Sequence, residues 1–270
     1  MCLKPLALRP GVQMIHPTAI IQPGAEIDSD VEIGPYAVIG PRVRIGRGTK
    51  VGPHAVIDGW TEIGAGNQIF HCAAVGGVPQ DLKYKGEETW LRIGDNNIIR
   101  EFATLQPGTV TGIGETVIGD HNLFMAYCHV AHDCIVGNRV IMANGSTLAG
   151  HVVVEDYSIL GGLSAVHQYT RVGESAMLSG GAMVGQDVLP YTVASGNRAT
   201  SAGLNLVGLK RRGFSAPLIS SLKKAYKIMV RSGLRLEVAI QRIREELPPS
   251  PEIAHIIEFA QKSERGICRS

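Results

Sequence analysis

A six-residue repeat runs through the first two thirds of the chain and limits what it can fold into. Branched aliphatic residues recur at every sixth position from residue 15 to residue 75, and the series resumes at Ile93, Ile99 and Leu105. Shifted by one residue, apolar side chains continue at the same spacing from Ile118 to Val184. Neither the period of a helix nor that of an ordinary strand has this length. Short strands that turn a corner every six residues have this period, because each aliphatic residue then points into one shared core.

Three hexads make one triangular coil, so residue i lies one coil below residue i+18. Successive coils are then spaced like hydrogen-bonded strands, about 4.8 Å apart. Narrow coils leave little interior room, which accounts for an aromatic content of only 5%. The repeat therefore predicts an all-β fold, a parallel β-helix of hexapeptide repeats over residues 14–190.

An insert interrupts the repeat at residues 76–92. Because the phase resumes at Ile93, the insert replaces a whole number of hexads and is expected to loop outward without disturbing the register. Asp81 and Lys83 alternate within it, so in an extended chain they point the same way. A polar loop on a rigid scaffold is typical of a binding site, although ordinary solvation of a loop explains the same residues.

The tail, residues 191–270, is predicted to be a small α-helical domain. An apolar stripe at helical spacing begins after Ser215, and Gly233 can end that helix. A second helix fits Leu236–Leu247, and a third begins with Ser250 as cap and proline at its first turn. Residues 1–13 precede the repeat and are expected to be a disordered extension.

Charge divides the chain into two unlike parts. Residues 1–191 hold 12 Lys and Arg against 18 Asp and Glu, a net charge of −6, whereas residues 192–270 hold 14 against 6, a net of +8. A basic tail suggests an acidic partner or a phosphate-bearing ligand. Sparse aromatics and the lack of a nucleic-acid motif argue against nucleic acid. No run of about 18 apolar residues predicts a membrane span.

The five cysteines form no CxxC pair and no even-numbered framework, which favours a reducing, cytoplasmic setting. Cys128 and Cys134 occupy the position of the repeat that takes a small residue, so they are expected to fill the core.

The segment at residues 127–134 is the richest in chemistry. Val130 takes the inward position, so His129 and His132 flank it and stay outside the core. Asp133 follows His132 directly, and a carboxylate can orient an imidazole and stabilise its protonated form, as a general base requires.

Coil arithmetic adds neighbours to His132. One coil above it come Gly150 and His151, and two coils above it come His167 and Gln168, all within about 10 Å. This stack predicts a polar active-site ledge with an accessible backbone N–H at Gly150. Unrelated surface histidines and a zinc site are the alternatives, but His129 and His132 straddle an inward residue and do not obviously converge on a metal.

A basic cluster follows the repeat at residues 205–214, with three consecutive cations that suit phosphate or an acidic protein surface. A solvated basic run is the plainer reading. On architecture alone, three classes of protein remain open, because a fold does not determine a function. These are an acyltransferase, a zinc-dependent carbonic anhydrase-like protein and a passive scaffold.

Five motifs in order resemble those of the UDP-N-acetylglucosamine O-acyltransferase family, which carries out the first step of lipid A biosynthesis. They are HVAHDCIVGN from His129, QDLKYKGE from Gln80, AGH ending at His151, AVHQ ending at Gln168, and GLKRRGF from Gly208. The resemblance runs from about Met14 to Arg265 and implies a left-handed coil.

The family likeness implies roles for three residues. His132 is expected to remove the proton of the glucosamine 3-hydroxyl, which then attacks the thioester of an (R)-3-hydroxyacyl group on acyl carrier protein. Asp133 orients His132, and the Gly150 N–H stabilises the oxyanion, which requires a preorganised donor.

Further residues are assigned to binding by the same likeness. The sugar and phosphate contacts correspond to Asp81, Lys83, His151 and Gln168, with His129 nearby. The contacts to the nucleotide and to the carrier protein correspond to His167, Asn205, Arg211 and Arg212. Gly180 corresponds to the position that selects acyl length, and glycine there predicts a long donor.

The likeness also implies a homotrimer with the active site between neighbouring copies. It implies no metal and no diffusible cofactor, because phosphopantetheine arrives on the carrier. Val207 and Arg198 depart from the residues expected at their positions. Two relatives of the same fold remain alternatives: a CoA-dependent acetyltransferase, whose tail and insert match poorly, and a UDP-sugar N-acyltransferase, whose usual N-terminal domain has no room before Ile15.

Overall fold

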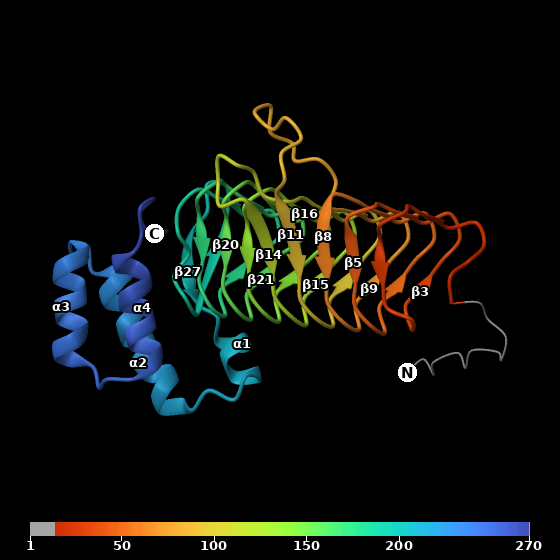
Figure 1. The fold of residues 1–270 in the computed structure, drawn as a ribbon. Helices are drawn as coiled ribbons and strands as arrows, with labels where there is room; N and C mark the ends of the chain where they lie inside the picture. Colours follow the sequence, from red (N-terminus) through yellow and green to blue (C-terminus); the bar gives the residue numbers. More distant parts are fainter. Residues whose placement is uncertain (1–13, 270) are drawn as a thin grey trace.

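Short parallel strands wind into a triangular prism, and a helical domain sits at one end of it (Figure 1). The structure is a computed structural model and describes residues 14–269. The extension predicted at residues 1–13 lies outside this range.

Three sheets form the faces of the prism. The first sheet consists of β1 (Ile20–Ile21), β4 (Val38–Ile39), β7 (Val56–Ile57), β10 (Ala74–Val75), β13 (Thr104–Leu105), β16 (His129–Val130), β19 (Thr147–Leu148), β22 (Ala165–Val166) and β25 (Met183–Val184). The second consists of β2 (Glu26–Ile27), β5 (Val43–Ile45), β8 (Trp60–Ile63), β11 (Trp90–Ile93), β14 (Glu115–Ile118), β17 (Ile135–Val136), β20 (Val153–Val154) and β23 (Arg171–Val172). The third consists of β3 (Glu32–Ile33), β6 (Lys50–Val51), β9 (Gln68–Ile69), β12 (Ile98–Ile99), β15 (Leu123–Phe124), β18 (Ile141–Met142), β21 (Ile159–Leu160), β24 (Met177–Leu178), β26 (Thr192–Ser195) and β27 (Thr200–Leu204).

The predicted coil of three hexads is confirmed by the strand register. Ile20 pairs with Val38 in the coil above, and the same step recurs wherever no loop intervenes. From Ile33 to Val184, every apolar residue of the repeat is buried. Those of the first described coil are partly buried and pack against the same core. The two cysteines expected in the core, Cys128 and Cys134, have no exposed surface.

Two consecutive coils carry extra residues at the same edge of the prism, between the first and second sheets. Ile93 pairs with Ile63, so the coil between them is two hexads longer than the regular coil and holds a loop at residues 76–89. The predicted insert ended at residue 92, but Trp90 already belongs to β11 because its backbone pairs with Trp60.

The one-residue shift of the repeat marks a second loop. Ile118 pairs with Ile93, so this coil exceeds the regular length by one hexad and one further residue, which form a loop at residues 106–114. We call the edge that carries these two loops, continued by residues 131–134, 149–152 and 167–170 in the coils above, the loop-bearing edge.

The prism ends later than predicted. The helical domain was expected from residue 191, but β26 and β27 form an antiparallel hairpin that extends the third sheet to Leu204. The helices follow at α1 (Leu206–Arg211), α2 (Ala216–Tyr226), η1 (Lys227–Arg231), α3 (Leu236–Glu246) and α4 (Pro251–Gln261). The predicted Ser250 cap is confirmed at α4, and Gly233 follows η1 at φ 71°. The apolar stripe predicted after Ser215 forms α2, and the Ser215 side chain also caps it. None of these helices is long and apolar enough to cross a membrane.

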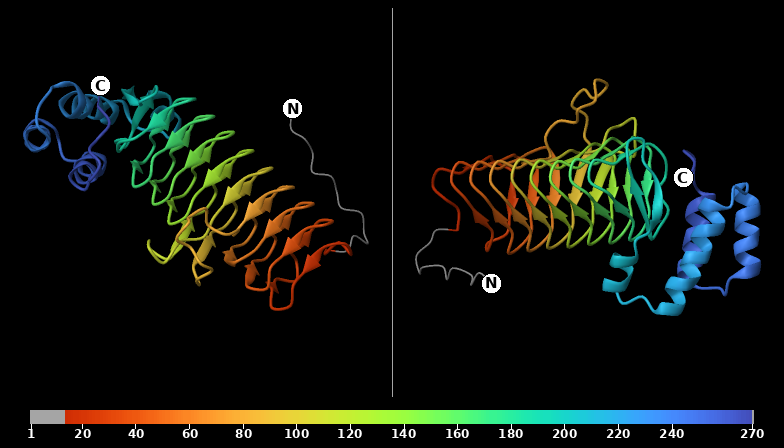
Figure 2. Two further views of the ribbon diagram at one scale, coloured as in Figure 1. Left: turned by 90° about the horizontal axis from the view of Figure 1, so that it is seen from above. Right: turned by 180° about the vertical axis from the view of Figure 1, so that it is seen from behind.

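The helical domain has its own apolar core and is tied back to the last coil. After α4 the chain returns to the prism, where Ile267 forms a bridge with Asp187 and Cys268 N donates to Asp187 O at 2.7 Å. The loop at residues 76–89, which we call the long loop, and α1 project from different sides of the prism. The front and back views agree on this (Figures 1 and 2).

Candidate active site

His132 and Asp133 form a hydrogen-bonded pair on the loop-bearing edge. Nδ1 of His132 lies 2.7 Å from Oδ2 of Asp133. The carboxylate has no exposed surface and accepts three further hydrogen bonds: from Thr109 N at 3.0 Å, Thr109 Oγ1 at 2.7 Å and Ile113 N at 3.0 Å. These four bonds occupy its acceptor positions.

The protonation of this pair follows from its surroundings. Burial by itself raises the pKa of the Asp133 carboxyl, but the hydrogen bonds from Thr109 and His132 outweigh it, so the pKa lies below its ordinary value. The carboxylate is therefore ionised near neutral pH and can only accept. Nδ1 of His132 must then carry the hydrogen, which leaves the lone pair of the neutral imidazole on Nε2.

A column of rings rises from this pair along the same edge. His151 N donates to His132 O at 3.0 Å, and the two rings meet edge to face with centroids 5.1 Å apart. Tyr169, one coil higher, stacks on His151 at 4.4 Å. Asp133, His151 and Tyr169 all have φ near +60° (58°, 62° and 62°), so the column stands on left-handed corners that non-glycine residues adopt only at a cost.

Gly150 lies against His132, as the coil arithmetic predicts. Among residues 14–269, no acceptor is found for its backbone N–H. An unpaired N–H beside an imidazole has the geometry of an oxyanion donor. The prediction that His132, Gly150 and His151 lie together is confirmed by their contacts.

The charge of Asp81, in the loop at residues 76–89, acts on His151. Burial lowers the pKa of His151, and the negative charges of Asp133 and Asp81 act in the opposite direction. The expectation of an extended segment around Asp81 and Lys83 is wrong, because Tyr84 N donates to Asp81 O at 3.1 Å and Lys83 N to Asp81 Oδ1 at 2.9 Å. The segment is a turn in which the Lys83 side chain is exposed.

The other predicted histidines border the same face. His129 is half-buried, with Nδ1 2.7 Å from Thr104 Oγ1, and burial lowers its pKa. His167 and Gln168 are exposed two coils above His132. A groove of about 800 Å³ runs beside His167 on the outer face of the first sheet, and its walls include Ala149, Ala165, Met183 and Arg198.

The other predicted nucleotide and carrier-protein contacts lie around α1. Asn205 is buried and caps α1, with Oδ1 accepting from Gly208 N at 3.0 Å and Nδ2 donating to Ser175 O at 2.9 Å. Arg212 donates to Glu174 at 2.6 Å and lies 3.7 Å above the ring of Tyr157.

Arg211 is exposed at the end of α1, on a different side of the prism from the long loop (Figure 2). Gly180 lies between β24 and β25, on an edge other than the loop-bearing one. Within one chain, the structure thus brings together the residues assigned to catalysis but not all of those assigned to binding.

The hydrogen-bonded pair of His132 and Asp133 also forms, with His151, a cluster of possible metal ligands. His132, Asp133 and His151 each offer one atom, and these atoms lie within 4.8 Å of one another. A metal would have to replace hydrogen bonds that Asp133 already accepts, so the donor set fits a metal poorly.

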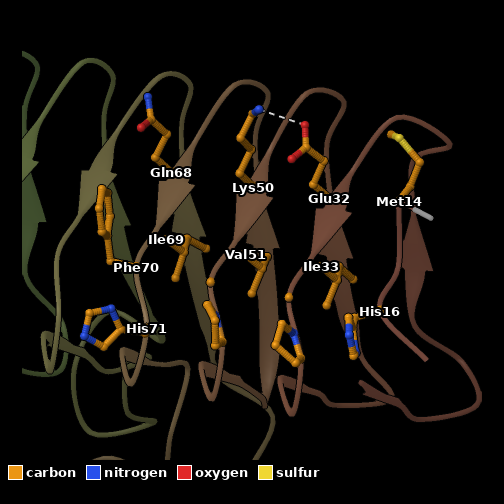
Figure 3. Close-up of a pocket in the computed structure, with 14 residues that line it drawn as sticks. Met14, His16, Glu32, Ile33, Lys50, Val51, Gln68, Ile69, Phe70 and His71 are labelled. Carbon is orange, nitrogen blue, oxygen red and sulfur yellow. Dashed lines mark ion pairs between the residues drawn. The ribbon is translucent and has the colours of Figure 1, made fainter. Parts of the chain in front are cut away.

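A second hollow, of about 420 Å³, lies at the N-terminal coils (Figure 3). Its floor is formed by β3, β6 and β9, with Met14 and His16 at one end and Phe70 and His71 at the other. The ion pair Lys50–Glu32, 2.7 Å, crosses its rim. It contains none of the predicted site residues.

Three residues of the site escaped sequence reasoning. Thr109 and Ile113 hold Asp133 from a loop whose trace in the sequence is the shift of the repeat after Leu105. Tyr169 could have been found, because it occupies the position one regular coil above His151.

Comparison with known proteins gives consistent results. Residues 187–268 match the family model described as UDP-N-acetylglucosamine O-acyltransferase, domain 2, and residues 25–59 and 115–150 match the bacterial transferase hexapeptide model. The acyl-(acyl-carrier-protein)–UDP-N-acetylglucosamine O-acyltransferase of Thermodesulfovibrio yellowstonii is 58% identical over 94% of this chain and 99% of its own length. Its counterpart in Burkholderia orbicola is 53% identical over the same shares.

A solved structure gives the same result for the fold. LpxA from Acinetobacter baumannii is 50% identical to this chain and superimposes with a TM-score of 0.93, covering 95% of this chain and 100% of its own. The prism is accordingly a left-handed parallel β-helix, as the resemblance implied.

Proposed function

The chain belongs to the UDP-N-acetylglucosamine O-acyltransferase family and is an acyl-carrier-protein-dependent O-acyltransferase of lipid A biosynthesis, and we propose that His132 is its general base. The observation that carries this proposal is the ionised, four-fold hydrogen-bonded Asp133 on Nδ1 of His132. It leaves Nε2 as the atom that can accept a proton.

The reaction proceeds in two steps from this geometry. Nε2 of His132 takes the proton of the glucosamine 3-hydroxyl. At the same time, the hydroxyl oxygen of the sugar attacks the thioester carbonyl carbon of an (R)-3-hydroxyacyl group. The C–O bond forms and the negative charge moves to the carbonyl oxygen, beside the Gly150 N–H. When the tetrahedral intermediate collapses, the C–S bond breaks and His132 returns the proton to the sulfur of the carrier.

The neighbours of His132 suit this proton transfer. Burial keeps the pKa of His151 and of His129 below the ordinary value, so both rings are mostly neutral near pH 7 and do not oppose the charge that forms on His132. Asp81, Lys83, His151 and Gln168 are assigned to the sugar and its phosphates. No metal and no diffusible cofactor enters the scheme, since the saturated carboxylate of Asp133 serves to orient His132.

We assign a homotrimer to the working enzyme. Asn205, Arg211 and Arg212 lie around α1, away from the long loop that bears Asp81 in the same chain (Figure 1). One copy therefore cannot bring all the binding residues to one His132, whereas a ring of copies related by closed symmetry can. Gly180 would likewise act on the acyl chain bound at a neighbouring copy.

The basic tail suits the acidic carrier protein. Residues 192–270 carry a net charge of +8, whereas residues 1–191 carry −6. Attraction between the basic tail and an acidic carrier protein raises the rate at which the two associate. Free thiols at Cys72, Cys128, Cys134 and Cys268 agree with a reducing cytoplasm.

The test is transfer from a panel of 3-hydroxyacyl carrier-protein thioesters to UDP-N-acetylglucosamine. We expect product from the wild type and a loss of about 10²- to 10⁴-fold in kcat for His132→Ala. His121→Ala, at an exposed histidine on another edge, is the matched control and should keep full activity. An active His132→Ala variant would remove the base assignment, and an inactive wild type with every donor would remove the reaction.

A further inference from the structure

The loop at residues 106–114 is built as a closed turn on the neighbouring coil. Gly108 N donates to Trp90 O at 3.1 Å, and Trp90 N donates to Gly114 O at 2.9 Å, so both ends are anchored on one residue. Gly114 N also donates to Thr109 O at 3.1 Å, which closes the turn. A loop held in this way can place a side chain as precisely as a strand does.

This turn surrounds the carboxylate of Asp133. Thr109 supplies two of its hydrogen bonds, one from the backbone and one from the hydroxyl, and Ile113 N supplies a third. Thr109 is only 1% exposed and Asp133 only 3%, so water cannot replace these donors. Because an ionised carboxylate only accepts, the hydroxyl hydrogen of Thr109 is committed to Asp133.

Gly112 leaves the space that the carboxylate fills. A β-carbon at Gly112 would collide with the carboxyl carbon and with both carboxyl oxygens of Asp133. The φ of Gly112 lies outside the left-handed region, so space and not backbone conformation calls for glycine here. Any larger residue would push the carboxylate away from Nδ1 of His132.

We propose that Thr109 and Gly112 are positioning residues of the acyl transfer. Thr109 fixes the carboxylate of Asp133 by two hydrogen bonds, and Gly112 provides the space for it. The turn thereby sets the tautomer and orientation of His132. This inference rests on the proposed function, because its effect on rate passes through His132 as the base.

The first test compares three threonine variants in the transfer assay. Thr109→Val should lower kcat by about 10- to 100-fold with little change in the KM for the nucleotide sugar, since it removes a hydrogen bond to a charged group. Thr109→Ser keeps the hydroxyl and should recover most of that loss. Thr116→Val is the matched control, because Thr116 is fully buried in the next strand and its hydroxyl has no partner in residues 14–269. Wild-type turnover in Thr109→Val would overturn the proposal.

A double-mutant cycle separates positioning from a general loss of structure. If Thr109 acts through Asp133, then Thr109→Val should cost nothing further in an Asp133→Ala background. Losses that multiply in the double variant would mean that Thr109 acts independently, and the proposal would be wrong.

A measurement without turnover covers Gly112 and keeps the inference separate from the proposed function. A hydrogen-bonded imidazole N–H gives a far-downfield proton NMR resonance, which His132→Ala identifies by its loss. We expect Gly112→Ala to abolish or move this resonance and Gly185→Ala to leave it unchanged, since a β-carbon at Gly185 meets no atom of the described residues within 4 Å. An unchanged resonance in folded Gly112→Ala refutes the positioning role. A wild type that shows the resonance but transfers no acyl group refutes only the reaction.

Discussion

A β-carbon at Gly150 would come within 2.6 Å of Cε1 of His132 and within 2.8 Å of Nε2. The backbone of Gly150 therefore lies beside the ring atom that we propose takes the proton. The proposed base and the proposed oxyanion donor come from adjacent coils, and the hydrogen bond from His151 N to His132 O, 3.0 Å, fixes their spacing. Their alignment is thus a property of the coil and not of a mobile loop.

Gly150→Ala should inactivate the enzyme without unfolding it. The new methyl group would displace the imidazole, and a displacement of about 1 Å can cost about 10²-fold in kcat. Gly162→Ala is the control, because among residues 14–269 its β-carbon would meet only Asn144 O, at 3.4 Å. Turnover and melting temperature of both variants are the measurements. Full activity in Gly150→Ala would contradict the packing described here.

Asp133→Asn should lower kcat by about 10²- to 10⁴-fold at neutral pH. The amide has nearly the same shape, but its NH₂ group must replace one of two accepting oxygens. In place of Oδ2 it faces Thr109 Oγ1 and Nδ1 of His132 and favours the wrong tautomer of His132. In place of Oδ1 it faces the backbone N–H groups of Thr109 and Ile113. Asp30→Asn serves as control, since Asp30 lies several coils from Asp133 and, within residues 14–269, its carboxylate accepts only from the backbone of Gly48. Equal rates for the two variants would remove Asp133 from the mechanism.

Gly180→Met should shift donor preference toward shorter acyl chains. Among residues 14–269, a β-carbon at Gly180 meets only Gly162 O at 3.5 Å, an ordinary contact, so the added β-carbon does not displace the prism backbone. Loss of a few methylene contacts corresponds to a change of about 10- to 200-fold in the ratio of kcat/KM values for long and short donors. If both enzymes rank the thioesters identically, Gly180 does not select length.

The stability of the junction between prism and helices should fall as pH rises past neutrality. His255 Nε2 lies 2.7 Å from Glu155 Oε2, and this hydrogen bond, against the effect of burial, raises the pKa of His255 above its ordinary value. A raised pKa stabilises the fold fully below the unfolded value of about 6.5, and the stabilisation is lost as pH rises through the folded pKa.

Melting curves of the wild type and of His255→Gln between pH 6 and 9 test this. The pair of His255 and Glu155 contributes less than about 1 kcal/mol to the free energy of unfolding, because both side chains are partly exposed. We expect the two melting temperatures to converge at high pH. A difference that stays constant across this range would mean that His255 is not charged in the folded protein.

The repeat predicts most of the prism because one inward residue in six reports the register directly. Ile33 and Val184 are buried for the same reason, and His132 could be placed below Gly150 from sequence numbers alone. The helices after Ser215 were predictable because their signals, a cap and an apolar stripe, are local.

The hydrogen bonds from Thr109 and Ile113 that hold Asp133 could not be predicted from the sequence. Thr109 and Asp133 lie in different coils and meet only because an insertion of one hexad and one further residue folds back onto the edge. The added hexad leaves the phase of the repeat unchanged, so the sequence records a shift of a single residue and hides the loop. The hairpin at residues 192–204 has no repeat at all; β26 pairs with β24, and β27 pairs with β26.

The loop-bearing edge places its residues at a fixed pitch. Asp133, His151 and Tyr169 stand on successive coils, and hydrogen bonding sets the interval between coils at about 4.8 Å. An insertion of one regular coil, 18 residues, would therefore move the residues above it by one interval without changing which of them face the edge.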